Sequence, residues 1–454
     1  MTRWYTVQTP ERAPAATGEQ AIYPDSAALD PKVNTSSGRR PLTVRGPAGA
    51  QLYKPFHYVL LVYLFLYCSR IPELFPSVHT GWVLQPILLV GMIITGRMAA
   101  IWRLPLGKVM IAFTCWVALG VPFSFWRGGS FTIFILVLQA LVLMAFMAAF
   151  VQTIPDCLRV MYTVGLAAAA IGILSLVIGG GRAGSTRLGL GSGVLTLSDA
   201  NILCLYIIIS LPFLWLSASL KTGFEKILLM SLTLPMLAAA SRTGSRMGLL
   251  ALVAGLVLYL IFSSAKQRLL VITGGIVFLM LAPFFTPQDM RERFLTYFHA
   301  RSAAAEEAAQ SAEARKELLI RSLEMTAEHP FLGVGPGEFM DAEAQEARDR
   351  DQRALWHLSH NSYTELSSET GIIGLVLFAT ALFGAYKGLS PIRNKNPSRR
   401  VRRAALFTQM AVLIGAVSAF FLSIAYGNIL AAVIAISATL QAAVANQTKL
   451  DRAS

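Results

Sequence analysis

The chain has 454 residues, of which 55% are hydrophobic and 14% are charged, and its formal net charge is +14. Soluble domains carry about 25% charged residues on average, so this composition excludes an ordinary soluble enzyme and indicates a membrane protein. The basic excess does not indicate a nucleic-acid partner. Basic residues recur in short loops between apolar runs, where they attract anionic lipid and fix the orientation of the chain in the bilayer.

The N-terminal segment, residues 1–52, is rich in Pro, Ala, Thr, Gly and Ser. It contains no apolar run that could form the core of a signal peptide. A segment of this composition cannot bury enough apolar surface to fold by itself. We therefore expect a disordered cytoplasmic tail over residues 1–52.

Apolar runs fill most of the remaining chain, and they predict about 12 transmembrane helices. A helix needs about 20 apolar residues to cross a hydrocarbon core of about 30 Å, and the runs lack the alternation of barrel strands. The predicted fold is therefore all-α and polytopic, with helices 1–9 in residues 53–285 and helices 10–12 in residues 361–446. The spans are centred on residues 58–67, 83–100, 110–125, 133–151, 160–178, 202–216, 227–240, 249–262, 270–285, 371–386, 404–426 and 429–445.

The basic residues predict which loops face the cytoplasm. If the N-terminus is cytoplasmic, every inward loop carries Lys or Arg, as the positive-inside rule requires. These residues are Arg97, Arg103, Lys108, Arg159, Lys221, Lys226, Lys266, Arg268, Lys387, Arg393, Lys395, Arg399, Arg400, Arg402 and Arg403. The chain is then a multi-pass membrane protein with a short cytoplasmic tail at residues 447–454 and a large loop outside the cytoplasm at residues 286–360, which is a periplasmic loop if the membrane is a bacterial inner membrane.

The predicted periplasmic loop is the one sizeable polar segment between the apolar runs. Residues 303–325 are rich in Ala, Glu, Arg and Leu, which predicts a solvated helix lying over the membrane surface. Arg315 and Arg321 on this helix are candidates to contribute to a site. After it, Pro330 and the glycines of residues 333–337 indicate tight turns rather than a nucleotide-binding loop, because no Lys-Ser/Thr ending follows them.

Two pairs of arginines lie on the predicted outer face, where the orientation rule gives no reason for them. Arg182 and Arg187 belong to a Gly-rich loop, and Arg242 and Arg246 directly precede an apolar run. One interpretation is that they extend to lipid headgroups or form ion pairs. The other is an anion site, since the planar guanidinium group can bind phosphate oxygens in pairs and stays charged in a poorly hydrated place.

The periplasmic loop ends on residues suited to proton transfer. His360 has an ordinary pKa near working pH and can act as a general base, while Asn361, Tyr363 and Glu365 could orient it or a sugar. The alternative is a structural histidine at a helix start. His357 and His360, one helical turn apart, lack a convincing third metal ligand, and Asp349-Arg350-Asp351 lies in a run of alternating charge that is typical of a solvated helix face. We therefore expect neither a metal nor another cofactor.

Three motifs in this order resemble the O-antigen ligase and O-antigen polymerase superfamily of bacterial membrane glycosyltransferases, over roughly residues 181–375. They are Thr243-Gly244-Ser245-Arg246, His329-Pro330 leading into Gly333-Val334-Gly335-Pro336-Gly337, and His360-Asn361-Ser362-Tyr363 followed by Glu369-Thr370-Gly371. The resemblance implies a multi-pass protein of the bacterial inner membrane with its active site facing the periplasm. It also implies metal-independent transfer of a glycan from an undecaprenyl-pyrophosphate donor. It implies that Arg246 and either Arg187 or Arg182 bind the pyrophosphate, with Arg242 as an additional candidate, and that His360 is the catalytic histidine.

The resemblance leaves the acceptor open. In ligases it is lipid A-core, and in polymerases it is a second lipid-linked glycan. A transporter or flippase of lipid-linked sugars is an alternative from another class, because it would also need arginines and a cavity. Transporters usually show internal repeats and charged or broken helices near the middle of the membrane. This sequence shows no repeat, and its ionisable residues lie at the ends of the predicted spans, which favours the enzyme.

The predicted orientation can be tested with single cysteines. A cysteine replacing Ser311 should react with a membrane-impermeant maleimide added outside the inner membrane, because residues 286–360 are predicted to be periplasmic. A cysteine replacing Asn396 should react only after the membrane is permeabilised. Reversed labelling of the two positions contradicts the orientation.

Overall fold

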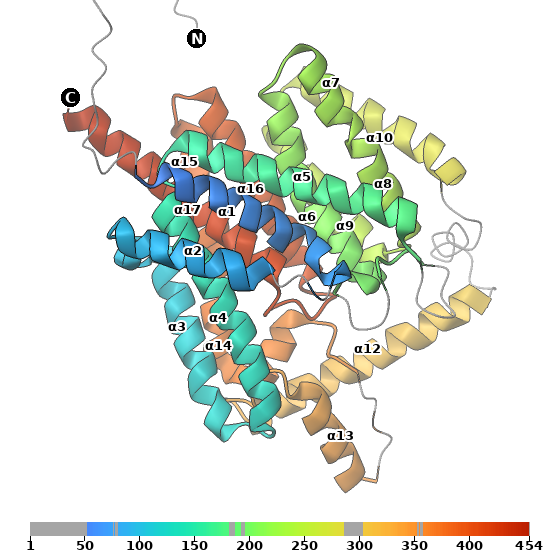
Figure 1. Cartoon of the computed structure of the whole chain (residues 1–454). Helices are drawn as coiled ribbons and strands as arrows, with labels where there is room; N and C mark the ends of the chain where they lie inside the picture. The colour runs from blue at the N-terminus through green and yellow to red at the C-terminus, as the bar shows by residue number, and fades with distance from the viewer. Residues whose placement is uncertain are drawn as a thin grey trace, which may run out of the picture. The chain divides into compact units, whose positions relative to one another are not determined.

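A computed structural model describes residues 52–75, 77, 80–180, 187–191, 196–285, 303–351, 354 and 357–453 (Figure 1). In these ranges the chain is built from helices and contains no β-strand, apart from one isolated bridge between Gly180 and Gly189. The predicted all-α fold is therefore confirmed. Arg182 and the predicted tail, apart from Leu52, lie outside the described residues.

The helices of the first half are mostly joined by short connections. They are α1 (Lys54–Ser69), η2 (Ile71–Leu74), α2 (Thr80–Ile94), η3 (Met98–Arg103), α3 (Pro105–Gly120), η4 (Val121–Phe123), α4 (Arg127–Phe150), α5 (Ile154–Ile178), η5 (Thr196–Ser198), α6 (Ala200–Ser219), α7 (Gly223–Ser231), α8 (Thr233–Arg242), α9 (Arg246–Phe262) and α10 (Ala265–Phe285). Capping side chains start several of them: Thr153 forms a capping box with Asp156, and Asp199 and Ser245 accept backbone N–H groups of α6 and α9.

The second half begins with two helices in the predicted periplasmic loop. They are α12 (Ala303–Glu328) and α13 (Phe339–Asp349), and α14 (Ser362–Lys387), α15 (Ser390–Lys395), α16 (Arg399–Ser418) and α17 (Asn428–Ala453) follow. The surface helix predicted over residues 303–325 is thus present as α12. Figure 1 shows α12 and α13 at one end of the bundle, and α12 packs against α14.

Eight helices in the described ranges are long and apolar enough to cross a membrane, and two shorter apolar helices, α2 and α9, accompany them. Each of the 12 predicted apolar runs falls largely within helical structure, but the count of about 12 spans is not confirmed. One predicted span is too long: the run 404–426 stops being helical after Ser418, at the end of α16. The chain leaves the helix there because the carbonyls of Ala419 and Leu422 accept the backbone N–H of Ser362 at the start of α14.

The centre of the bundle is formed by α6, whose neighbours are α5, α8, α9 and α16. Large side chains of these helices, such as Phe213 and Met161, are fully buried. The helices α2, α7 and α10 instead expose apolar side chains such as Trp82 and Leu270. Exposed apolar faces of this kind suit contact with lipid, since helices that cross a membrane turn apolar residues toward the hydrocarbon.

Helix α14 contains a break at Gly371, where φ is 70° and ψ is −179°. The helix begins at Ser362, nine residues before the apolar run that the sequence analysis took as the span. At the break, the Pro330 carbonyl accepts the N–H of Ile372 at 2.9 Å. A Cβ atom on Gly371 would overlap the carbonyl oxygen of Phe331. Only glycine adopts this backbone conformation readily, so the loop at residues 330–331 and the break in α14 depend on each other.

Gly371→Ala should destabilise the protein by about 1–3 kcal/mol, because alanine is strained at this φ and its methyl group collides with the loop. The measurement is thermal unfolding of the purified protein in detergent. Gly274→Ala on α10 is the matched control, because a Cβ there meets no atom within 4 Å. Equal stability of the Gly371→Ala variant and the wild type would show that the break is not required.

Candidate active site

The first arginine cluster and the Thr243-Gly244-Ser245-Arg246 motif are in contact. The Arg187 guanidinium donates from Nε to the Thr243 carbonyl at 2.8 Å and from Nη2 to Asn201 Oδ1 at 2.7 Å. The backbone N–H of Leu188 donates to the Arg242 carbonyl at 3.1 Å. Residues more than 50 positions apart are therefore joined by hydrogen bonds, and Arg187 serves as part of the scaffold that shapes the turn before α9.

That turn places Arg246 at the first position of α9. Gly244 has a φ of 60°, which lets α8 and α9 meet in a tight turn, and Ser245 caps α9 by accepting the Gly248 N–H at 3.3 Å. The half-buried Arg246 side chain therefore lies at the N-terminus of α9, close to backbone N–H groups of the first turn and to the positive end of the helix dipole. This combination favours an anion.

Asp199 brings a carboxylate to the same place. It is the N-cap of α6, and its Oδ1 accepts the N–H groups of Asn201 at 2.7 Å and Ile202 at 3.2 Å. It also interacts electrostatically with Arg315 of α12 and with His360. The sequence analysis missed Asp199. The pattern that could have found it is an Asp at the N-cap position of an apolar helix. It lies two residues before Asn201, which accepts a hydrogen bond from Arg187.

His360 lies at the junction between the loop and α14. Its φ of 53° is left-handed, and Asn361 behind it caps α14 by accepting the Tyr363 N–H at 3.0 Å. Burial lowers the pKa of His360, the positive charges of Arg315 and His357 lower it further, and Asp199 opposes them. A pKa below the ordinary value keeps the imidazole neutral at neutral pH, which is the form that can accept a proton.

The residues proposed to orient His360 hold α14 in place. Asn361 provides the cap, and the Tyr363 hydroxyl donates to the Ala416 carbonyl of α16 at 2.9 Å while its ring packs on Phe420. Glu365 is buried one helical turn before Glu369. These contacts fix the start of α14, and therefore the position of His360. Their role in the reaction itself stays a prediction.

The glycine-rich motif, residues 333–337, forms hydrogen bonds to the first half of α14. The N–H groups of Gly337 and Phe339 donate to the Glu369 carboxylate at 2.9 and 3.2 Å, and the Val334 N–H donates to the Ser368 carbonyl at 2.8 Å. Gly333, with a φ of 69°, touches the Glu369 backbone so closely that a side chain has no room. The predicted tight turns are present, and the motif holds the loop against the membrane helices.

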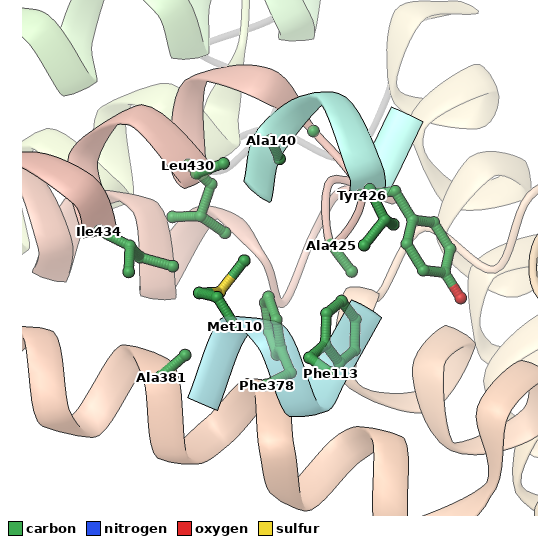
Figure 2. Close-up of a pocket in the computed structure, with 12 residues that line it drawn as sticks. Met110, Phe113, Ala140, Phe378, Ala381, Ala425, Tyr426, Leu430 and Ile434 are labelled. Carbon is green, nitrogen blue, oxygen red and sulfur yellow. The ribbon is translucent and has the colours of Figure 1, made fainter. Parts of the chain in front are cut away.

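Beyond Glu369, the bundle contains a small apolar cavity of about 20 Å³ (Figure 2). Tyr426 borders it, and Figure 2 shows the Tyr426 hydroxyl turned away from the apolar side chains. That hydroxyl donates to Glu369 Oε2 at 2.8 Å. The cavity is lined by Met110, Phe113, Val137, Ala140, Phe378, Ala381, Ala425, Tyr426, Gly427, Leu430, Ala431 and Ile434.

One group of side chains in the described residues could hold a metal ion. Its members, Glu328, His329 and Glu346, place ligand atoms within 4.8 Å of one another. Arg350 lies 3.3 Å from Glu328 and 3.5 Å from Glu346, so a guanidinium already supplies positive charge to these carboxylates. Arg350 of the acidic-basic run thus takes part in surface ion pairs. The prediction that the reaction needs no metal stays a prediction.

The other candidate arginines differ in their surroundings. Arg242 ends α8, and its half-buried guanidinium makes no hydrogen bond or ion pair with the part of the chain that the structure describes. Arg321 pairs with Glu343 and Glu317, which makes it a link between α12 and α13. Arg315 interacts electrostatically with Arg246 and His360. The structure therefore brings Arg187, Arg246, Arg315 and His360 to one end of the bundle, with Asp199 among them.

Comparison with known proteins finds a family match over part of the chain. Residues 231–379 match the O-antigen ligase family. The matched range runs from the end of α7 into α14 and includes Arg246, Arg315 and His360. The chain is also 28% identical over 131 residues to a Rickettsia conorii protein named "Putative polysaccharide ligase". That match covers 28% of this chain and 29% of the relative, so it spans less than a third of either protein. The predicted family resemblance is confirmed over residues 231–379, and the long apolar helices indicate a multi-pass membrane protein.

Proposed function

We propose that this chain is a membrane glycosyltransferase of the inner membrane. It moves a glycan from an undecaprenyl-pyrophosphate donor to an acceptor hydroxyl at the periplasmic face. The observation that carries this proposal is the convergence of Arg187, Arg246, Arg315 and His360 from four separate segments. Arginines with a nearby neutral imidazole, next to membrane helices, suit a lipid-linked phosphate that must leave while an alcohol attacks.

The arginines would bind the donor pyrophosphate. Arg246 combines a guanidinium with the N-terminus of α9, and Arg187 is held rigidly by Thr243 and Asn201. Charge develops on the departing pyrophosphate as its bond to the anomeric carbon breaks. Donors fixed in advance stabilise that charge more effectively than water does, because they need not reorient during the reaction. No metal ion is required in this scheme.

His360 would accept the proton of the attacking hydroxyl. The acceptor oxygen forms a bond to the anomeric carbon, the bond from that carbon to the pyrophosphate oxygen breaks, and undecaprenyl pyrophosphate leaves. The proton moves from the acceptor hydroxyl to the neutral imidazole. The lowered pKa of His360 keeps this base unprotonated before the reaction.

The proposed acceptor is lipid A-core, as in an O-antigen ligase. A polymerase that joins two lipid-linked glycans would use the same donor half of the site. The test is to give the purified protein a defined undecaprenyl-pyrophosphate glycan together with either lipid A-core or a second donor molecule. Glycan attached to lipid A-core supports the ligase, a lengthened lipid-linked glycan supports the polymerase, and neither product from active donor contradicts the proposed transfer.

Arg246→Lys should lose most transfer activity although it keeps the positive charge, because an ammonium cannot form the paired hydrogen bonds of a guanidinium. The expected loss is about 2–4 kcal/mol of transition-state stabilisation. It is measured as kcat/KM for the donor, with Arg321→Lys as the control, since Arg321 pairs with Glu343 and Glu317. Normal transfer by well-expressed Arg246→Lys would move the phosphate site elsewhere, with Arg242 the next candidate.

His360→Ala should slow glycan transfer by about a hundredfold or more while leaving donor binding nearly intact, because a positioned general base contributes about that much. His357→Ala should be much milder, since His357 is exposed. Transfer rate and donor affinity are measured separately for both variants. Loss of donor binding in His360→Ala would assign the histidine to the phosphate site, and unchanged transfer would make it structural.

A further inference from the structure

Arg70 ends α1 in a backbone conformation that is unusual for arginine. Its φ of 53° and ψ of 13° are left-handed, and its N–H donates to the Leu66 carbonyl at 3.1 Å, which closes the last turn of the helix. Glycine is common at this position, because a Cβ atom is disfavoured there. The Arg70 side chain is only 22% exposed. An arginine at a position that favours glycine indicates that its side chain has a role in the structure around it.

The Arg70 guanidinium belongs to a network of three residues. It forms an ion pair with Glu73 of η2 and donates from Nη2 to Thr196 Oγ1 at 2.9 Å. Glu73 Oε1 accepts the Thr196 hydroxyl at 2.9 Å, and Glu73 Oε2 accepts the Thr196 N–H at 3.0 Å. Hydrogen bonds to charged groups are the stronger class, and here they are partly buried. The network therefore fixes Thr196 against the connection that follows α1.

Thr196 is the first residue of η5, and η5 supports the chain around Arg187. The Leu190 N–H donates to the Leu197 carbonyl at 2.8 Å. A Cβ on Gly189 would overlap the carbonyl oxygen at the end of η5, so the two segments are in direct contact. The position of η5 therefore determines where the segment that carries Arg187 lies.

Arg187 continues these contacts to α9. Its Nη2 donates to Asn201 Oδ1 at 2.7 Å, in the first turn of α6 that follows η5. Its Nε donates to the Thr243 carbonyl at 2.8 Å, in the turn that places Arg246 at the start of α9. Hydrogen bonds and short chain segments thus connect the end of α1 to both arginines. All of these connections lie in loops predicted to face away from the cytoplasm.

We propose that Arg70 and Glu73 are positioning residues for the donor site. By holding Thr196 they fix the position of η5, and with it Arg187 and the turn before Arg246. Guanidinium groups that bind a pyrophosphate together must be held at a fixed separation, because small displacements of positioned groups weaken binding and slow the reaction. In this arrangement neither Arg70 nor Glu73 contacts the donor. The inference rests on the proposed function and deepens it.

The first experiment measures the order of residues 187–190 in the donor-free, full-length protein. Thr196→Val removes the hydroxyl that Arg70 and Glu73 hold, and Thr196→Ser keeps it. Hydrogen–deuterium exchange, followed by mass spectrometry, should be about tenfold faster over residues 187–190 in Thr196→Val, because the backbone hydrogen bonds of this segment open more often. Thr196→Ser should exchange like the wild type. Unchanged exchange in a folded Thr196→Val protein overturns the proposal.

The second experiment measures the consequence for the donor. Affinity for undecaprenyl pyrophosphate should fall about tenfold in Glu73→Gln and in Thr196→Val, and Thr196→Ser should restore it. In the transfer reaction KM for the donor should rise, whereas KM for the acceptor should not. A general loss of folding would lower kcat and leave both KM values unchanged, so this split identifies positioning. Wild-type donor affinity in Thr196→Val contradicts the proposal.

The matched control is Glu225→Gln. Glu225 also forms an ion pair with a basic residue, Lys221, but its side chain is 64% exposed and it lies in a loop predicted to face the cytoplasm. This variant should change neither the exchange of residues 187–190 nor the donor affinity. An equal effect of Glu225→Gln and Glu73→Gln would show that the loss is general, which overturns the specific role of Glu73.

A double-mutant cycle tests the route through Arg187. Arg187→Gln by itself should weaken donor binding, and Thr196→Val added to it should weaken binding no further, because the network acts through Arg187. Fully additive losses contradict this route.

Failure of this inference and failure of the proposed function give different results. Failure of the proposed function appears as normal transfer by Arg246→Lys, which does not depend on Thr196. Failure of the inference appears as wild-type exchange and wild-type donor affinity in Thr196→Val, while Arg246→Lys has lost transfer.

Discussion

The buried Glu369 carboxylate holds the extramembrane segment against the helical bundle, and the candidate site depends on that attachment. It accepts hydrogen bonds from the N–H groups of Gly337 and Phe339 and from the Tyr426 hydroxyl. One side chain of α14 thereby joins the loop before α13 to the loop between α16 and α17. A buried carboxylate without such donors would be strongly destabilising, so the glycine-rich turns that expose these N–H groups are a requirement of the fold.

This attachment explains how residues from distant segments reach one place. The break at Gly371 lets the first half of α14 turn into the loop, and Ser362 is held by the carbonyls of Ala419 and Leu422. His360 is positioned by that anchored helix start. Helix α12, whose Thr326 hydroxyl lies 2.8 Å from the Ser367 hydroxyl, is fixed to the same half of α14 and carries Arg315 toward α9. The positions of His360 and of the helix that carries Arg315 therefore depend on contacts of α14.

The helices and the position of Arg246 could be predicted from the sequence, because the patterns that indicate them lie within short segments of the chain. Apolar runs of membrane length predicted the helices, and Gly244 and Ser245 before an apolar run placed Arg246 at a helix start. The roles of Asp199 and Arg315 depend on interactions between residues 45 or more positions apart, and no local pattern reports such interactions. The end of α16 was misjudged for a related reason: Ala419 and Leu422 are apolar enough to continue a span, yet their carbonyls accept the N–H of Ser362.

The central claim is that Arg187, Arg246 and Arg315 form one diphosphate site beside His360. It is tested most directly by determining the structure of the full-length protein in lipid nanodiscs with undecaprenyl pyrophosphate bound. The account predicts density for both phosphates within hydrogen-bonding distance of the Arg246 and Arg315 guanidinium groups, with Arg187 still holding Thr243 and the His360 imidazole beside the phosphates. Phosphate density away from these arginines, for example at the cytoplasmic basic residues 393–403, would contradict it.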